Sequence, residues 1–458
     1  MQEPFAAMTP AGSTGAAWVD ERRRRLATAW LGLGVTALAL AGIFALLLVA
    51  ARAPGTGALF PTQDFFRVAL IVHVDQSVLI WFLAFGGVLW ALAARPVRGL
   101  SWAAFGVSAA GCLLVAASPF LGAADPLLNN YVPVLQHPLF VTALAAFGLG
   151  VLLQVVAYFS QVRSELRWGD PVGVGTFTAA LATLVAGLSL VWTWAELPPH
   201  WEGKAFYEYL FWGPGHALQF AYTQILLVAW IWLVRVQGRE PPLGDRVLSA
   251  FLVLGILPLL AVPLVHALYA PDSAETRLAF TRLMQWGNGL GAVPIGLAVL
   301  VALLRGRTGL AGPEAVPIRR ALAASLTLFA AGGILSLLIS GSNTLVPAHY
   351  HGSIVGVTLA LMGLSYHLLP RLGFGTPAGR TARIQPWIYG GGQLLHIGGL
   401  ALSGALGIQR KTAGAAQGLD SLAAKLSMGV MGIGGLLAVI GGILFVLGVI
   451  GAFSRRGH

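Results

Sequence analysis

The sequence predicts an all-α polytopic membrane protein with twelve transmembrane helices. Of its 458 residues, 57% are hydrophobic and only 10% are charged, whereas a soluble globular chain carries about 25% charged residues. Twelve apolar runs reach the length of roughly 20 residues that a bilayer span requires. The fourteen tryptophans are typical of aromatic belts at membrane interfaces. A single cysteine, Cys112, excludes disulfides within the chain and cysteine-based metal sites.

Proline, glycine and charged clusters separate the runs, and no soluble domain interrupts them. The predicted spans are residues 27–50, 67–94, 100–122, 133–161, 172–195, 209–234, 247–270, 279–304, 319–340, 346–369, 387–407 and 427–453. We therefore expect a cytoplasmic N-terminal segment at 1–26, one twelve-helix transmembrane domain at 27–453 and a cytoplasmic tail at 454–458. The first span is too long for a signal peptide and lacks a clear cleavage site, which predicts an uncleaved anchor.

Charge fixes the expected orientation. If the N-terminus lies in the cytoplasm, 20 of the 28 basic residues fall in cytoplasmic segments, as the positive-inside rule requires. This asymmetry favours an even number of spans with both termini cytoplasmic, as in a bacterial-type inner membrane. The net charge of +11 then mostly reflects basic residues that set the orientation of the chain in the membrane, and no nucleic-acid partner is expected.

Histidines are the main functional signal. His349 and His351 lie two residues apart and would project about 200° apart on a helix, so that one helix could hold a flat metal cofactor on each flank. In the predicted orientation, these two share one depth in the outer third of the membrane with His73, His216 and His266. Ionisable residues inside spans are functional candidates, although two satisfied polar residues near a helix end remain the alternative for the pair. Three further histidines are expected to have structural roles: His137, His367 and His396.

The residues around these histidines resemble the catalytic subunit I of the haem–copper oxidase superfamily. The resemblance covers all twelve spans and places histidines on the second, sixth, seventh and tenth, as that family does. It rests on the runs Leu70–Gln76, Phe211–His216, Leu264–Tyr269, the His-Tyr-His run at 349–351, and Tyr366–Arg371. It implies two haems, with b-type favoured, and one non-haem metal, either iron or copper.

The resemblance also implies a role for each histidine. His73 and His351 would be the axial ligands of a low-spin haem, and His349 the proximal ligand of a high-spin haem. An axial pair leaves no open position and suits electron transfer, whereas a single ligand leaves room for chemistry. His216 and His266 would hold the non-haem metal across from that open position. Arg410 and Lys411 look like the family's basic pair for haem propionates, with an ordinary solvated loop as the alternative.

The sequence departs from the family's pattern at the metal. The second of two adjacent histidines on the seventh span is replaced by Ala267, so that a third ligand must come from elsewhere; the candidates are Gln219, Tyr269 and Asn288. Oxygen-reducing members carry a cross-linked tyrosine at positions that correspond here to Phe220 and Leu260. Tyr222 is expected to face a different direction. Cleavage of the O–O bond is therefore disfavoured.

The expected proton supply also argues against reduction of dioxygen. Asp75 is the only acidic residue inside a predicted span, and a path from the inner face would need ionisable residues along it. Protons would therefore enter from outside, and pumping is not expected. For each acid in the loops, a solvated surface accounts for it equally well. The candidates for proton entry are Asp75, Glu196, His200, Glu202 and Glu208.

These features favour the nitric oxide reductase branch, which reduces NO to N₂O. Usual members of that branch carry glutamates at positions that correspond here to Phe220 and Gly291, so the chain would be a divergent member. The alternatives are reduction of dioxygen by a cytochrome c oxidase, a non-catalytic dihaem electron carrier and a twelve-span transporter. No Cys-Xaa-Xaa-Cys-His motif is present. Electrons would therefore come from a second subunit with cytochrome c or copper, from soluble cytochrome c, or from a quinol.

Overall fold

The computed structural model describes residues 19–51, 60, 64–163, 165–305, 314–377, 379–410 and 419–455. The chain divides into two compact units. Unit 1 comprises Met1–Ile231 and Glu240–Leu304, and unit 2 comprises Trp232–Arg239 and Arg305–His458. The single domain expected at 27–453 stays a prediction, and each unit is described by itself.

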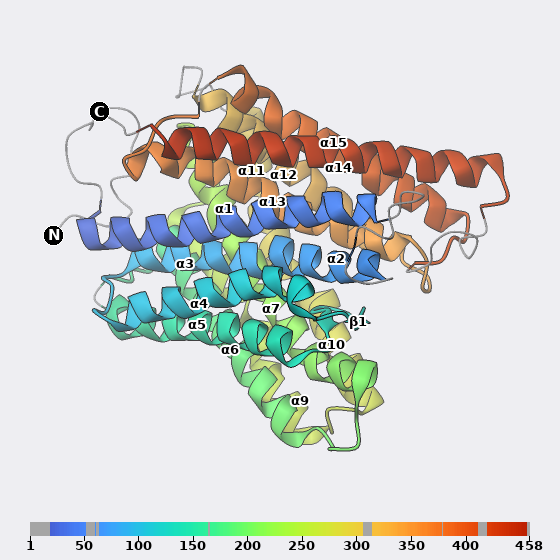
Figure 1. Ribbon diagram of the computed structural model, residues 1–458. Coiled ribbons are helices and arrows are strands. Elements are labelled where there is room, and N and C mark those ends of the chain that lie inside the picture. The colour runs from blue at the N-terminus through green and yellow to red at the C-terminus, as the bar shows by residue number, and fades with distance from the viewer. Residues whose placement is uncertain are drawn as a thin grey trace. The chain divides into compact units, whose positions relative to one another are not determined.

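Unit 1 contains the first eight predicted spans, some of them built from more than one helical segment (Figure 1). In chain order its helices are α1 (Glu21–Ala50), α2 (Phe65–Val74), the π-helical turn η3 (Asp75–Ile80), α3 (Trp81–Ala93), α4 (Leu100–Ala117), η4 (Ser118–Leu121), α5 (Pro138–Val162), α6 (Pro171–Glu196), α7 (Gly203–Val236), α8 (Asp245–Leu254), η5 (Leu257–Ala261), α9 (Val262–Leu268), α10 (Ala274–Gly287) and α11 (Gly289–Arg305). The last turn of α7 belongs to unit 2.

A two-residue hairpin lies in the connection between α4 and α5. Strand β1 (Pro126–Leu127) pairs antiparallel with β2 (Val134–Leu135), with Pro126 opposite Leu135. The pairing closes the loop 128–133 between the strands.

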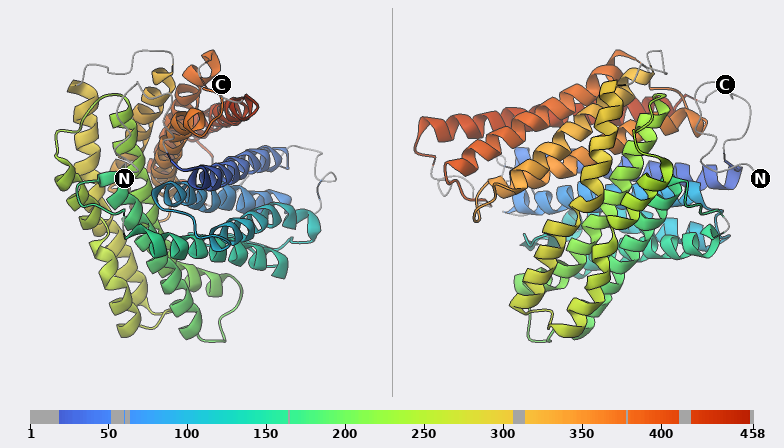
Figure 2. Two further views of the ribbon diagram at one scale, coloured as in Figure 1. Left: turned by 90° about the vertical axis from the view of Figure 1, so that its left-hand side faces the viewer. Right: turned by 180° about the vertical axis from the view of Figure 1, so that it is seen from behind.

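Unit 2 contains four long helices: α12 (Ala315–Ser336), α13 (Leu345–Arg371), α14 (Arg380–Ala405) and α15 (Leu422–Phe453). α12 packs along α13, and α14 packs along α15. Figure 2 shows α14 and α15 side by side at the red end of the colour scale.

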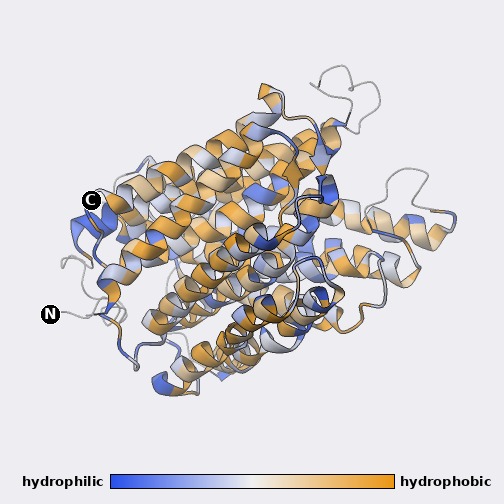
Figure 3. Ribbon diagram, turned by 90° about the horizontal axis from the view of Figure 1, so that it is seen from below, coloured by the Kyte–Doolittle hydropathy of each residue, from blue (hydrophilic) through white to orange (hydrophobic). Residues whose placement is uncertain are grey.

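Eleven helical segments of the described residues are long and apolar enough to cross a membrane. α14, with 26 residues, is also long enough to cross a membrane. Polar residues such as Gln385, Gln393 and His396 make it less apolar than the other eleven. With α14 included, the helices match the twelve predicted spans in order and nearly in length. Figure 3 shows apolar residues along most of these helices and hydrophilic residues mainly near their ends. The all-α polytopic membrane fold is therefore confirmed.

Several helices begin after a residue whose side chain caps the first turn. The Asp20 carboxylate accepts hydrogen bonds from the backbone of Arg22 and Arg23 at the start of α1, which satisfies amide groups that have no partner within the helix. His137 plays this role for α5, where its Nδ1 accepts from the Leu139 amide at 3.3 Å, just before Pro138. The structural role expected of His137 is confirmed.

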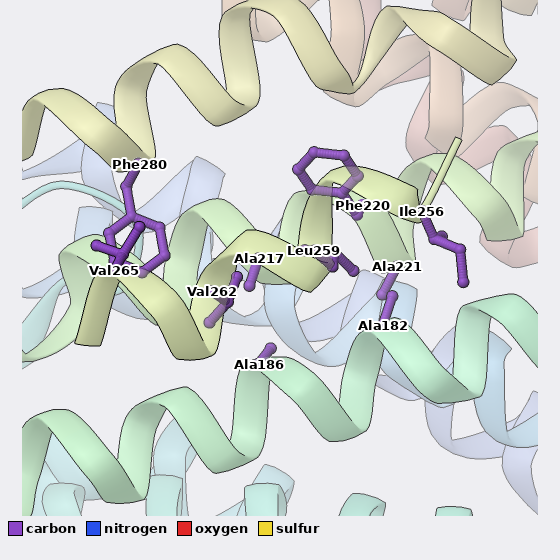
Figure 4. Close-up of a cluster of buried hydrophobic side chains, with 10 residues drawn as sticks. All are labelled: Ala182, Ala186, Ala217, Phe220, Ala221, Ile256, Leu259, Val262, Val265 and Phe280. Atoms are coloured by element: carbon purple, nitrogen blue, oxygen red, sulfur yellow. The ribbon is translucent and has the colours of Figure 1, made fainter. Parts of the chain in front are cut away.

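In unit 1 an apolar cluster joins α6, α7, η5, α9 and α10. Figure 4 shows Phe280 beside Val265 at one end of it, and Phe220 close to Leu259 further along. Phe220 and Phe280 are fully buried. Phe280 of this cluster borders two of the histidines described below.

In unit 2 the contact between α12 and α13 depends on glycine. A Cβ added to Gly332 would lie 2.5 Å from the Ser353 amide nitrogen, and one added to Gly352 would lie 2.7 Å from the Gly332 Cα. Backbone atoms cannot move aside as a flexible side chain can. The two glycines therefore set how closely the helices approach each other. The neighbouring Gly333, by contrast, faces open space.

We predict that Gly332→Ala lowers the melting temperature of the purified protein by several degrees, because overpacking of this kind costs about 1–3 kcal/mol. Gly333→Ala is the matched control, since it adds the same methyl group to the same helix without a clash. That substitution should leave the melting temperature unchanged or raise it slightly, because alanine favours helix by up to about 1 kcal/mol over glycine. Equal melting temperatures for the two variants would contradict this packing.

Candidate functional site

His73 lies near the end of α2, and its ring is held by the neighbouring helix. Its Nδ1 is 2.8 Å from the backbone oxygen of Ala41 on α1. A carbonyl oxygen only accepts hydrogen bonds, so Nδ1 carries the proton and Nε2 keeps its lone pair. Ligating histidines commonly have this arrangement, because the bond fixes both tautomer and ring orientation. His73 therefore fits an axial ligand of a haem.

The helix changes geometry immediately after His73. Asp75 begins the π-helical turn η3, and such turns occur frequently at functional sites. Its carboxylate is 1% exposed, and neither oxygen has a hydrogen-bond partner among the described residues. A buried carboxylate without partners is costly, which supports a functional rather than a structural origin for it.

In unit 2, the histidine pair of α13 is held in the same way as His73. His349 Nδ1 is 2.8 Å from the Gly332 oxygen on α12, which the close packing at Gly332 brings within reach. His351 Nδ1 is 2.8 Å from the Pro347 oxygen, one turn earlier on α13. In both rings the protonated nitrogen is again Nδ1, so that Nε2 is the nitrogen suited to bind a metal.

The two rings have different neighbouring helices. His349 contacts α12, whereas the His351 ring lies 5.0 Å from the ring of His396 on α14 and 4.8 Å from that of Tyr350. His396 is itself held by the Met431 oxygen through Nδ1, at 2.9 Å. Within unit 2, the pair thus has the opposite-flank arrangement that a two-residue spacing predicts. His396, expected to be structural, packs directly against a candidate ligand.

His216 in α7 is buried and has both ring nitrogens engaged. Nδ1 is 2.6 Å from the Trp212 oxygen, and Nε2 is 2.7 Å from the Tyr131 hydroxyl. Because the carbonyl requires a proton on Nδ1, the phenol must donate its hydrogen bond to Nε2. The lone pair that a metal would use therefore points at a phenol oxygen.

His266 in α9 is also buried, and its ring stacks on Trp192 at 5.3 Å. Its Nε2 is 2.8 Å from the Ser189 hydroxyl, and its Nδ1 is buried with no hydrogen-bond partner in the described part of the chain. The rings of His216 and His266 both border the ring of Phe280, at 6.2 and 5.5 Å. Two buried imidazoles at one apolar cluster, one with an unsatisfied nitrogen, fit a metal pair.

The described residues supply no third ligand of the usual kind. Within the described ranges, no three His, Cys, Asp or Glu residues group closely enough to hold a metal. Of the three candidates from sequence, Tyr269 is 41% exposed and Gln219 is half-buried, while the buried side-chain oxygen of Asn288 has no hydrogen-bond partner among the residues that the structure describes. Among the described residues, no contact with His216 or His266 favours one of these three as the third ligand.

Neither of the two positions that correspond to the oxidase tyrosine is a tyrosine here. Phe220 is packed within the apolar cluster of Figure 4, and Leu260 is 76% exposed. Tyr222 packs against Phe82 at 5.0 Å, as its different direction on the helix predicts.

Tyr131 contacts a candidate ligand, and sequence reasoning missed it. It lies in the hairpin loop, 85 residues before the histidine that it contacts. Its local sequence does not predict this contact, because only the fold of the loop brings Tyr131 to α7. The run Leu128-Asn129-Asn130 before it indicates a turn at most.

The remaining candidates have diverse surroundings. Glu196, His200 and Glu202 are exposed, whereas Glu208 is half-buried and binds the backbone and side chain of Asn130. Arg410 donates to the Ser342 hydroxyl at 3.2 Å, and Lys411 lies outside the described residues. His367 accepts a hydrogen bond from Arg371 at 3.1 Å and packs near Trp232 in unit 2. This agrees with the structural role expected of it.

Comparisons with known proteins agree with this picture. Residues 25–447 match the family model described as cytochrome c and quinol oxidase polypeptide I. An uncharacterized protein of Rickettsia prowazekii is 30% identical over 488 residues, covering 92% of this chain and 94% of that protein. An uncharacterized protein of Aquifex aeolicus is 29% identical over 364 residues, covering 78% and 88%.

The fold also matches a solved structure. The cryo-EM structure of a heme-copper terminal oxidase dimer gives a TM-score of 0.75 at 18% identity, covering 96% of this chain and 85% of that one. Family match, relatives and fold are consistent over almost the whole length. This chain therefore belongs to the cytochrome c and quinol oxidase polypeptide I family.

Proposed function

We propose that this protein is the catalytic subunit of a respiratory reductase that converts nitric oxide to nitrous oxide without pumping protons. The family makes the chain a membrane respiratory protein of the haem–copper oxidase superfamily, whose general activity is oxidoreduction. The choice of NO rests on one observation. At the two positions where oxygen-reducing members carry their tyrosine, this chain has Phe220 within an apolar cluster and Leu260 on an exposed surface.

Three histidines are proposed as haem ligands. His73 and His351 would be the axial pair of the low-spin haem, and His349 the only protein ligand of the high-spin haem. The support is the same for all three: each is half-buried, and each has Nδ1 held by a backbone oxygen. Arg410 and Lys411 are proposed to meet the propionates.

His216 and His266 are proposed to hold the non-haem metal. When bound, the haems would pass electrons from the donor to the site, and the high-spin haem and this metal would bind the gas. The chain would contribute apolar surroundings, because both imidazoles are buried and their rings border Phe280 of the apolar cluster. The balanced reaction is 2 NO + 2 e⁻ + 2 H⁺ → N₂O + H₂O.

Protons are proposed to arrive from the outer side. Glu208, anchored on Asn130, is the half-buried acid nearest in the chain to His216. Asp75, two residues beyond His73, has a buried carboxylate without partners among the described residues. Electrons would come from a second subunit with cytochrome c or copper, or from soluble cytochrome c. The proposed location is a bacterial inner membrane, with both termini cytoplasmic.

Reduction of dioxygen is the second candidate, and one observation favours it. The Tyr131 hydroxyl donates to His216, so that a phenol does lie beside one proposed metal ligand, although from a loop rather than from the two family positions.

Amperometry with purified protein and a chemical reductant distinguishes the two substrates. We predict NO consumption at least tenfold faster than O₂ consumption, with one N₂O formed for every two NO consumed. The His216→Ala variant is the control, and it should lose most of the NO activity because the metal loses an imidazole. Faster O₂ than NO consumption would reject the proposal in favour of an oxidase.

A second prediction concerns the assignment of the histidine pair. His351→Ala should abolish the low-spin haem absorption while CO binding to the high-spin haem persists, since His349 is unchanged. His349→Ala should produce the opposite pattern. Visible spectra of the reduced and the CO-treated protein provide the measurement. Loss of CO binding alone in His351→Ala would reverse the two assignments.

A further inference from the structure

The contact between Tyr131 and His216 joins a loop residue to a proposed metal ligand. The phenol oxygen lies 2.7 Å from Nε2, and the two rings lie 4.5 Å apart at 46°. Nε2 is the nitrogen that the Trp212 carbonyl leaves unprotonated. The phenol oxygen therefore occupies the space directly in front of the metal-binding lone pair.

One face of α7 holds the loop in this position. Glu208, Trp212, Gly215 and His216 recur at helical spacing and so lie on the same side of the helix. The Glu208 carboxylate binds the Asn130 backbone at 2.9 Å, and Trp212 packs edge-on to the Tyr131 ring at 5.7 Å. Gly215 leaves space for that ring, since a Cβ there would clash with the Tyr131 Cγ.

Tyr131 adopts an unusual backbone conformation in this position. Its φ is +66°, and it is the only non-glycine residue with positive φ among those the structure describes. For a bulky side chain this region is unfavourable, and such outliers persist only where surrounding contacts enforce them, often at functional sites. The loop is therefore strained in the conformation that presents the phenol to His216.

We propose that Tyr131 is an oxygen ligand of the non-haem metal that His216 binds, which rests on the function proposed above. Nε2 and the phenol oxygen lie 2.7 Å apart and now share one proton. An ion bound by both atoms would take the place of that proton.

This ligand would fill the position that Ala267 leaves empty. On binding, the phenol O–H bond breaks, the oxygen bonds to the metal, and the proton leaves to water, as is general when protonated groups become ligands. Two imidazoles with one anionic oxygen resemble the set of two histidines and one carboxylate that is typical of non-haem iron. The inference thus favours iron as the metal.

Metal content and resonance Raman spectra of the oxidised holoprotein test this inference. The wild-type protein should contain three irons for every two haems and show phenolate-to-iron vibrations. Tyr131→Phe keeps the ring but removes the oxygen. It should lose these vibrations and bind the third iron at least about tenfold more weakly, in the range seen when metal sites lose supporting groups.

Tyr207→Phe is the matched control, because it removes a hydroxyl from α7 itself at a ring that stacks on Phe211. It should keep the vibrations and the iron. The low-spin haem spectrum reports folding in each variant, since its proposed ligands lie elsewhere. A wild-type protein with a non-haem metal but no phenolate vibration would overturn the Tyr131 assignment alone. A wild-type protein with haems and no further metal would overturn the proposed function as well.

Discussion

A hydrogen bond from an imidazole Nδ1 to a backbone oxygen is the interaction on which the candidate site depends. It recurs at His73, His216, His349 and His351, with distances between 2.6 and 2.8 Å. In each case it fixes the ring and leaves Nε2 as the nitrogen that could bind a metal. It also satisfies one polar atom of a group that is expensive to place in a membrane interior.

These bonds need particular backbone geometry. A regular helix uses its own carbonyls for i to i+4 bonds, so that a histidine must share an oxygen one turn earlier or reach a neighbouring helix. His216 and His351 do the first, whereas His73 and His349 do the second. For His349, the close approach of α12 at Gly332 makes the second solution possible. In unit 2, the packing of α12 against α13 therefore also sets the orientation of the His349 ring.

The histidines proposed for the non-haem metal differ from the proposed haem ligands in their polar contacts. His216 and His266 each face a hydroxyl group, from Tyr131 and Ser189, while apolar residues enclose the rest. Dry surroundings strengthen any electrostatic interaction within them. A metal held here by two histidines would need further donors from such groups. The loop that carries Tyr131 is therefore part of the site that we propose.

The sequence by itself determined the membrane fold, the order and approximate limits of the twelve spans, and the five histidines of interest. Apolar runs report burial in lipid directly, because a spanning backbone must satisfy its hydrogen bonds within a helix. Imidazoles at one depth in such runs indicate ligands, because an unpaired imidazole is costly to bury in hydrocarbon. The same reasoning predicted that Ala267 leaves the metal short of a ligand, and its candidates Gln219, Tyr269 and Asn288 did not include Tyr131.

Only the tertiary structure decided which oxygen holds each imidazole, where α12 meets α13, and that a loop tyrosine reaches His216. Every residue has a carbonyl, so the residue types do not reveal which one will accept a bond. The contact of Tyr131 spans 85 residues and depends on a positive φ in a short hairpin loop. Neither feature has a periodic pattern, because both arise from the packing of segments that are distant along the chain.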